Sequence, residues 1–87
     1  MKQYNNTTVK YNDKGGMDIS LHGNHIIHIE SNKPIKINLC GWNTTVTRRR
    51  INQIMTECGY PFRINNKNGI PHVNDISIQE NGWVDLC

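Results

Sequence analysis

Isoleucine dominates the apolar residues of this sequence, with twelve isoleucines against four valines and three leucines, and there is no alanine at all. Isoleucine favours strands and alanine is the best helix former, so this composition predicts mainly β structure. Thirteen asparagines add residues that suit turns. A chain of 87 residues is too short for a multidomain enzyme or a large cofactor fold. We therefore expect residues 1–87 to form a single domain.

The first half of the chain shows the two-residue period of half-buried strands. Apolar and polar residues alternate, and Gly-, Asn- and Pro-containing segments interrupt the alternation at turns. The expected strands are residues 8–11, 17–22, 25–30 and 35–40. The pattern predicts an antiparallel meander of about four strands across residues 7–40.

One helix is expected over residues 48–58. Its apolar residues recur with the spacing of a single helical face. Thr47 is a suitable N-cap, Gly59 occupies the position of a C′ glycine, and Val46 could pack on Ile51 as a hydrophobic staple. The apolar stripe consists of Ile51, Ile54, Met55 and Cys58.

The segment after the helix has the pattern of one or two hairpins. Asn68-Gly69 is a strong turn signal between strands near 62–64 and 70–73. Pro71 would place the second of these strands at a sheet edge. Residues 76–86 suggest a last hairpin around Asn81-Gly82. The predicted fold class is α+β: a meander, one helix on the sheet, and one or two C-terminal hairpins.

Positive charge gathers in the middle of the chain. The overall formal charge is +3, but residues 32–63 carry six basic residues against Glu57 alone. An uneven basic region favours an anionic partner, although solvated surface charge explains such asymmetry equally well. The sequence has no apolar run of membrane-spanning length, so we expect no membrane association.

The basic residues are densest at the predicted helix entry, where Arg48, Arg49 and Arg50 would occupy the first three helical positions. Cations are unfavourable at a helix N-terminus by about 0.3–1 kcal/mol each, so a function is a reasonable explanation. The free N–H groups there, threonine hydroxyls and arginine forks all suit an anion. A solvated basic helix end is the alternative. The predicted ligand-binding residues are Trp42, Thr44, Thr45, Thr47, Arg48, Arg49, Arg50 and Asn52.

Trp42 has two possible roles in this segment. It could stack on a nucleic-acid base, as aromatic residues of single-strand binders do. It could equally close the edge of a small core, and we expect the core role.

The histidines and cysteines give no recognised site pattern. A two-residue turn at Gly23-Asn24 would make His22 and His25 cross-strand neighbours, and Cys40 could complete a zinc site. The spacing fits no tight zinc-ligand pattern, so we expect exposed strand histidines and no metal. With no P-loop, no Rossmann glycine motif and no nucleophile elbow, we expect neither an enzyme nor a cofactor.

The segment Gly41-Trp42-Asn43-Thr44-Thr45-Val46-Thr47-Arg48-Arg49-Arg50-Ile51-Asn52 resembles the signature of a small bacteriophage domain of unknown function. In that family a strand leads through Gly-Trp or Gly-Tyr and Thr-rich residues to Arg-Ile-Asn at a helix start. Residues 7–11 and 19–26 also resemble its first strands. The resemblance implies a phage protein in the host cytoplasm, and no settled activity.

These observations predict a non-enzymatic phage accessory protein that acts by stoichiometric binding. Its ligand would be a nucleic acid or nucleotide, and its role would be antagonism of a host defence. The alternatives are a protein–protein inhibitor of the anti-CRISPR kind and a structural phage component. A small core and open sheet edges also predict a homodimer.

Overall fold

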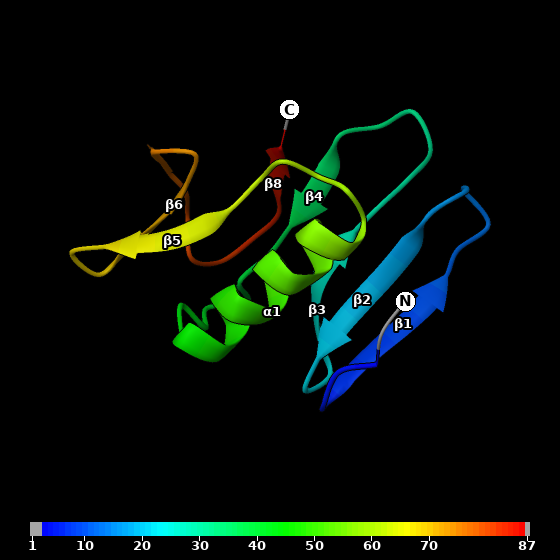
Figure 1. Ribbon diagram of the computed structural model, residues 1–87, viewed down its shortest axis with the longest axis horizontal. Coiled ribbons are helices and arrows are strands. Elements are labelled where there is room, and N and C mark those ends of the chain that lie inside the picture. Colours follow the sequence, from blue (N-terminus) through cyan, green and yellow to red (C-terminus); the bar gives the residue numbers. More distant parts are fainter. Residues whose placement is uncertain (1–2, 87) are drawn as a thin grey trace.

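The computed structural model describes residues 3–86, and these form eight strands and one helix. The elements are β1 (Thr7–Tyr11), β2 (Met17–Leu21), β3 (Asn24–His28), β4 (Ile35–Ile37), α1 (Thr45–Glu57), β5 (Ile64–Lys67), β6 (Ile70–Val73), β7 (Ile76–Ser77) and β8 (Val84–Leu86). A large sheet has the strand order β1-β2-β3-β4-β8, and a small sheet has the order β5-β6-β7 (Figure 1). All pairings are antiparallel, so the α+β class with one helix is confirmed.

The predicted four-strand meander forms the body of the large sheet. Ile19 of β2 pairs with Val9 on one side and with Ile27 on the other, and Ile27 in turn pairs with Ile37. This cross-strand row keeps β-branched side chains together on one face, which is the arrangement that the alternating sequence requires.

The predicted last hairpin does not form. β7 pairs with β6 across a two-residue turn at Asn74-Asp75, whereas β8 pairs with β4 as the fifth strand of the large sheet. Both turn residues have positive φ, which asparagine and aspartate tolerate better than most residues. Turn signals alone predicted local pairing for both strands, and the long-range pairing of β8 follows instead from burial of Leu86.

Pro71 lies in the central strand of the small sheet and not at an edge, contrary to the sequence prediction. β7 ends at Ser77, which pairs with His72, so the regular β6–β7 pairing stops just before Pro71. The nitrogen of proline carries no hydrogen and could not donate to a longer β7. The Pro71 carbonyl still accepts a hydrogen bond from the Ile78 N–H at 2.9 Å. The short third strand therefore makes a central proline acceptable.

The helix begins one turn earlier than predicted. Thr44 is the N-cap in place of Thr47, and its side chain accepts a hydrogen bond from the Thr47 N–H at 3.3 Å. The earlier start extends the buried stripe, because Thr47 is buried one turn before Ile51. It also moves the three arginines to the fourth, fifth and sixth helical positions, where the unfavourable dipole interaction is weaker.

The two helix ends differ in how well they were predicted. At the C-terminus, Gly59 is the C′ residue with φ +79°, and the Gly59 and Tyr60 N–H groups bond back to Thr56 and Met55, so that prediction is confirmed. At the N-terminus, the predicted staple is absent because Val46 lies inside the helix and is 50% exposed.

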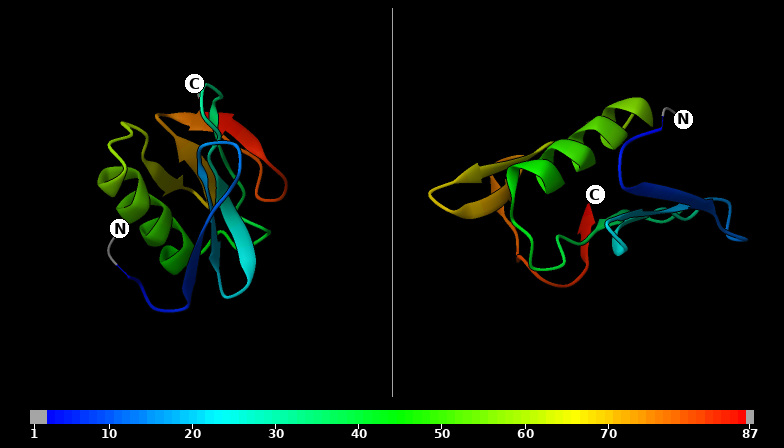
Figure 2. Two further views of the ribbon diagram at one scale, coloured as in Figure 1. Left: turned by 90° about the vertical axis from the view of Figure 1, so that its right-hand side faces the viewer. Right: turned by 90° about the horizontal axis from the view of Figure 1, so that it is seen from below.

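The core lies between α1 and one face of the large sheet, and Figure 2 shows the helix on that side. The predicted stripe is confirmed: Ile51, Ile54 and Met55 are buried, and Cys58 packs at the edge of the same cluster. The sheet contributes the predicted inward-facing residues Ile19, Leu21, Ile35 and Ile37, and Leu39 is buried in the segment just after β4. No helix within residues 3–86 has the length and apolar character needed to cross a membrane.

Candidate functional site

The helix entry places Trp42 at the surface. Its side chain is 57% exposed, so the expected core role of Trp42 is wrong. Beside it lies a shallow hollow of about 280 Å³ between the β2–β3 turn and the first turn of α1. The hollow is lined by Leu21, His22, Asn24, Trp42, Thr44, Val46 and Thr47. The geometry therefore puts an exposed aromatic ring next to threonine side chains and a helix N-terminus.

Asn43 ties this entry to the rest of the molecule. Its side-chain amide nitrogen lies 3.0 Å from the Asn66 amide oxygen and 3.3 Å from both the Gly69 carbonyl and a Glu80 carboxylate oxygen. Arg48 contacts the same residue from the helix, donating to the Asn43 carbonyl at 2.9 Å and to its side-chain oxygen. Arg48 thus fixes the loop before the helix.

Arg50 is committed to the N-terminal segment. Its guanidinium donates to the Asn5 carbonyl at 2.7 Å and to the Thr7 hydroxyl, and its Nε donates to Gln53 at 3.0 Å. The guanidinium carbon also lies 4.9 Å from the centre of the Tyr4 ring, within the range of a cation–π contact. These contacts attach the start of the chain to the helix.

Arg49 differs from its two neighbours. It is exposed, and it forms no hydrogen bond or ion pair with any residue in the part of the chain that the structure describes. Thr45, also exposed, lies four residues earlier and therefore on the same side of the helix. The three arginines consequently do not converge on one point: Arg48 and Arg50 hold different loops, and Arg49 is available to a ligand.

The remaining predicted site residues have structural contacts. Asn52 exchanges two hydrogen bonds with the backbone of Ile64, at 2.9 Å and 2.8 Å, which joins the helix to the small sheet. The Thr44 and Thr47 hydroxyls bond to each other at 3.1 Å. Of the eight predicted residues, those with side chains most open to a ligand are Trp42, Arg49 and Thr45, whose hydroxyl accepts one long hydrogen bond from Arg48 at 3.5 Å.

A second cluster of functional groups, not predicted from the sequence, lies on the face of the large sheet that points away from the helix. Asp18 Oδ1 lies 3.0 Å from His25 Nε2 and in hydrogen-bonding contact with His28 Nδ1. The other ring nitrogen of His28 lies 2.8 Å from a Glu30 carboxylate oxygen. We call Asp18, His25, His28 and Glu30 the outer-face cluster.

The register of the β2–β3 hairpin creates this cluster. The turn residues are His22 and Gly23, both with positive φ, so the prediction of a Gly23-Asn24 turn is wrong by one residue. His22 consequently does not pair with His25. One extra residue in β3, Ile26, forms a β-bulge opposite Ile19 and Ser20.

The bulge brings two histidines to the same face. His25 and His28 are three residues apart, so a regular strand would place them on opposite faces. With the bulge, Ile26 and Ile27 are both buried and both histidines point outward above Asp18. The sequence signal was the pair of adjacent isoleucines between two histidines, but their joint burial depends on the tertiary core.

Cys40 does not join the histidines. Its thiol donates to the His25 backbone carbonyl at 3.3 Å, so the zinc site that could have combined His22, His25 and Cys40 is not assembled. Burial raises the pKa of the Cys40 thiol and the pKa of the Cys58 thiol, which disfavours the reactive thiolate at both positions.

The protonation states of the outer-face cluster are coupled. Hydrogen bonds to Glu30 and Asp18 raise the pKa of His28. Partial desolvation opposes ionisation of Asp18, but hydrogen bonds from His28 and Asn12 outweigh it and lower the pKa of this carboxyl. The hydrogen bond from His28 likewise lowers the pKa of Glu30. The arrangement favours two carboxylates on either side of one imidazole ring.

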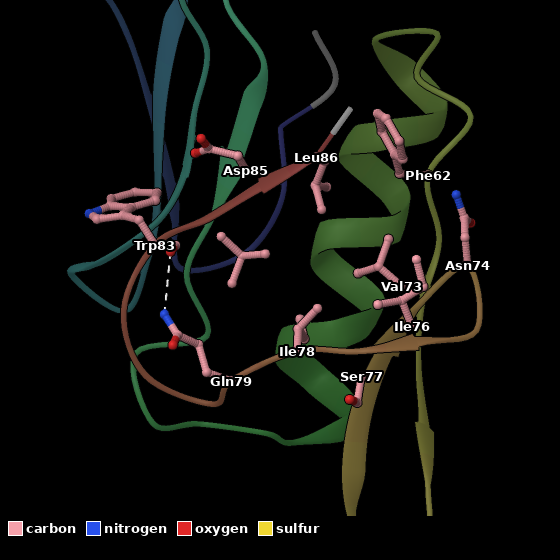
Figure 3. A pocket seen from close by; sticks show the side chains of 11 residues that line it. Phe62, Val73, Asn74, Ile76, Ser77, Ile78, Gln79, Trp83, Asp85 and Leu86 are labelled. Atoms are coloured by element: carbon pink, nitrogen blue, oxygen red, sulfur yellow. Dashed lines mark hydrogen bonds between the residues drawn. The ribbon is translucent and has the colours of Figure 1, made fainter.

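Trp83 shields one side of the cluster. Its ring meets the His25 ring edge to face, with ring centres 4.8 Å apart. Trp83 also lines a hollow of about 430 Å³, and Figure 3 shows its ring directed away from Phe62 and Asn74 at the opposite end of the lining. Ile76, 69% exposed, contributes to the apolar lining.

Comparison with known proteins places the chain in a phage family. No curated protein and no solved structure matches it. Residues 1–85 match the family described as Kyanoviridae Gp96 protein, which agrees with the expectation of a small phage domain. This match spans nearly the whole sequence, and the chain belongs to the Kyanoviridae Gp96 protein family of phage proteins.

Proposed function

We propose that this phage protein is a non-catalytic accessory protein that binds a phosphate-bearing ligand at the helix entry. The observation that carries the proposal is the 57% exposure of Trp42 beside the start of α1. A large apolar ring that faces water contributes little to the stability of the fold, whereas a base stacked on it contributes about 1–3 kcal/mol to the binding free energy. Trp42 would supply the stacking surface, and Arg49 the charge.

The position of Arg49 supports an anionic ligand. Two of the three arginines have structural partners, and only Arg49 is exposed without one among residues 3–86. Thr45 lies on the same helical face and adds a hydroxyl group. A phosphate contact by Arg49, with a base on Trp42, would use the groups that the fold leaves unsatisfied.

The exposure of Trp42 at the rim of the neighbouring hollow favours a nucleic-acid strand that lies partly in solvent over an enclosed nucleotide. The volume of the hollow, about 280 Å³, is just below the ~300–1,000 Å³ of typical small-molecule pockets. An open site of this size suits one stacked base, with the remainder of the strand in solvent. Sequestration of such a strand in the host cytoplasm would be a means of antagonising a nucleic-acid-directed defence.

The test is binding of fluorescently labelled single-stranded DNA and RNA, measured by anisotropy at several salt concentrations. Trp42→Leu and Arg49→Glu should each weaken binding by about tenfold or more, and Arg49→Glu should reduce the salt dependence. Arg63→Glu is the matched control, because Arg63 is exposed, its side chain bonds only to the adjacent Phe62 carbonyl among residues 3–86, and the substitution gives the same charge change.

Two results would contradict the proposal. One is the absence of binding by the wild-type protein at low salt. The other is equal loss in Arg49→Glu and Arg63→Glu, which would indicate attraction to net charge without a site.

A protein partner is the second candidate, as an inhibitor of the anti-CRISPR kind or as a structural phage component. The apolar hollow beside Trp83, with Ile76 69% exposed, favours it. Ile76→Asp should then abolish recovery of a specific partner from infected-host lysate, while Arg49→Glu should retain it. The opposite pattern would favour the nucleic-acid proposal.

We also propose that the protein is a homodimer. β1 and β7 are sheet edges, and Tyr11 at the first edge is 77% exposed. Light scattering should report twice the 10.0 kDa chain mass. A particle of single-chain mass at high protein concentration would contradict this state.

A further inference from the structure

We propose that the outer-face cluster binds a divalent transition-metal ion of the zinc type, with Asp18, His25 and His28 as ligands. This site lies on the sheet face opposite the helix and does not depend on the function of the helix entry. Two imidazoles and one carboxylate form a recognised ligand set for zinc and its first-row neighbours. Three protein ligands leave at least one position for water or for a group from another molecule.

The distances fit a single ion. One ligand atom from each residue lies within 4.8 Å of the other two, and Asp18 Oδ1 lies 3.0 Å from His25 Nε2. In a tetrahedral zinc site with bonds of ~2.0–2.1 Å, neighbouring ligand atoms are about 3.3 Å apart. The Asp18 oxygen lies closer than this to both histidine nitrogens, so the carboxylate must move outward to admit the ion.

The orientations of the rings also fit. The His25 and His28 rings are nearly perpendicular, at 81°, with centres 5.9 Å apart in an edge-to-face arrangement, so they do not stack. His25 presents Nε2 and His28 presents Nδ1 to the same carboxylate oxygen. Both imidazoles therefore direct one nitrogen atom toward the same carboxylate, so an ion bound next to Asp18 would be within reach of both rings.

Glu30 supplies the outer support that metal-bound histidines usually have. The His28 nitrogen that does not face Asp18 lies 2.8 Å from the Glu30 carboxylate. A carboxylate in this place holds the ring, fixes which nitrogen is free for the metal and makes that nitrogen more basic. Lys14, 3.6 Å from Glu30, restrains the carboxylate in turn.

The backbone explains why these groups meet. The β-bulge at Ile26 puts both histidines on one face, and β-bulges are frequent where a strand must redirect a side chain at a functional site. Asp18 pairs directly with His28 across the strands, so two ligands come from rigid, hydrogen-bonded positions. A site on paired strands is held more precisely than one on loops.

The experiment measures Zn²⁺ binding to chelator-treated full-length protein by competition with a chromophoric chelator, and repeats it with Co²⁺ by absorption spectroscopy. We expect one equivalent of metal. Loss of a hydrogen bond to a metal-bound histidine typically weakens metal affinity by ~10–100-fold, and we expect a loss of this size for Glu30→Gln. Asp18→Asn and His28→Asn each remove a ligand and should weaken metal affinity by more than this.

The matched control is His22→Asn. His22 lies in the same hairpin, is exposed and has φ +51°, a conformation that asparagine tolerates, so the variant removes an imidazole without disturbing the strand. It should bind metal as the wild type does. Circular dichroism of every variant separates loss of a ligand from loss of the fold.

Three outcomes would overturn the proposal. The first is wild-type affinity no higher than that of folded Asp18→Asn, which would leave the cluster as a hydrogen-bonded ion-pair network without a metal. The second is an equal loss in His22→Asn. The third is a thiolate charge-transfer band in the Co²⁺ spectrum, which would assign the bound metal to a cysteine.

Discussion

The helix entry and the outer-face cluster both concentrate charged and polar side chains, but they do so in opposite ways. The three arginines of the entry are consecutive in sequence and diverge in space, because successive helical residues point about 100° apart. Asp18 and the two histidines are separated in sequence by a turn and a bulge, yet they converge on one carboxylate oxygen. Closeness in sequence is thus a poor guide to a shared site, whereas strand register is a good one.

The largest expected effect is a loss of stability that disrupts both the helix entry and the outer-face cluster, because both depend on the same hydrophobic core. Ile54 is fully buried at the centre of the helical stripe. Ile54→Ala should lower the free energy of unfolding by about 2–4 kcal/mol, through lost burial and the cavity that remains. Urea unfolding measures this effect. Val46→Ala, at a half-exposed position of the same helix, should change stability by less than about 0.5 kcal/mol.

A substitution at Gly16 should affect the outer-face cluster and leave the helix entry intact. A Cβ atom at this position would lie 1.8 Å from the Ile29 carbonyl oxygen, on backbone that cannot turn aside. Gly16→Ala should lower the free energy of unfolding by about 1–3 kcal/mol through this overlap. It should also weaken the backbone hydrogen bonds between Met17 and Ile29, next to Asp18.

Amide hydrogen exchange at Ile29 and urea unfolding together check the Gly16 prediction. Asp13→Ala, in the same turn but exposed, is the control and should behave as the wild type. Unchanged exchange at Ile29 in Gly16→Ala would mean that the turn can move without moving the strand.

Removal of Asn43 should disturb the helix entry alone. Its amide links the loop before α1 to Asn66, Gly69 and Glu80, and it receives the guanidinium of Arg48. A net hydrogen bond contributes about 0.5–1.5 kcal/mol, so Asn43→Ala should destabilise by about 1–2 kcal/mol in urea. Asn65→Ala, an exposed asparagine in β5, should have no measurable effect.

The smallest stability effect is expected for Arg49→Glu. Arg49 has no partner among the described residues and lies beyond the first helical turn, where the helix dipole is weak. The variant should match the wild type within about 0.5 kcal/mol in thermal or urea unfolding. A larger loss would show that Arg49 has a structural role like that of Arg48 and Arg50.

The sequence predicted those features that depend on local periodicity. The alternation of isoleucines identified the meander and its inner face, and the spacing from Ile51 to Cys58 identified the buried side of the helix. Asn68-Gly69 and Gly59 were correctly assigned because each meets a backbone requirement of positive φ within a few residues. These are features in which local preference and global fold agree.

Several of the errors have a common physical cause, which is that tertiary burial selected among local options of similar quality. Thr44 and Thr47 are both suitable caps, and the choice of Thr44 allows Thr47 to be buried. Burial of both Ile26 and Ile27 required the bulge, which in turn moved the hairpin turn and assembled the outer-face cluster. The partner of β8 was not predictable from local sequence, because it lies about fifty residues earlier.

That distant pairing has a consequence for how the protein is made. Ile35 and Leu86 occupy paired positions on β4 and β8, so the large sheet closes only after nearly the whole described chain is available. A nascent chain that has reached the helix already contains the meander but still presents β4 as an open edge. Formation of the β4–β8 pair must also overcome the entropy of closing a loop of this length. The β4–β8 pair can therefore form only once residues 84–86 are available, and until then β4 is an open edge that can pair with another nascent chain.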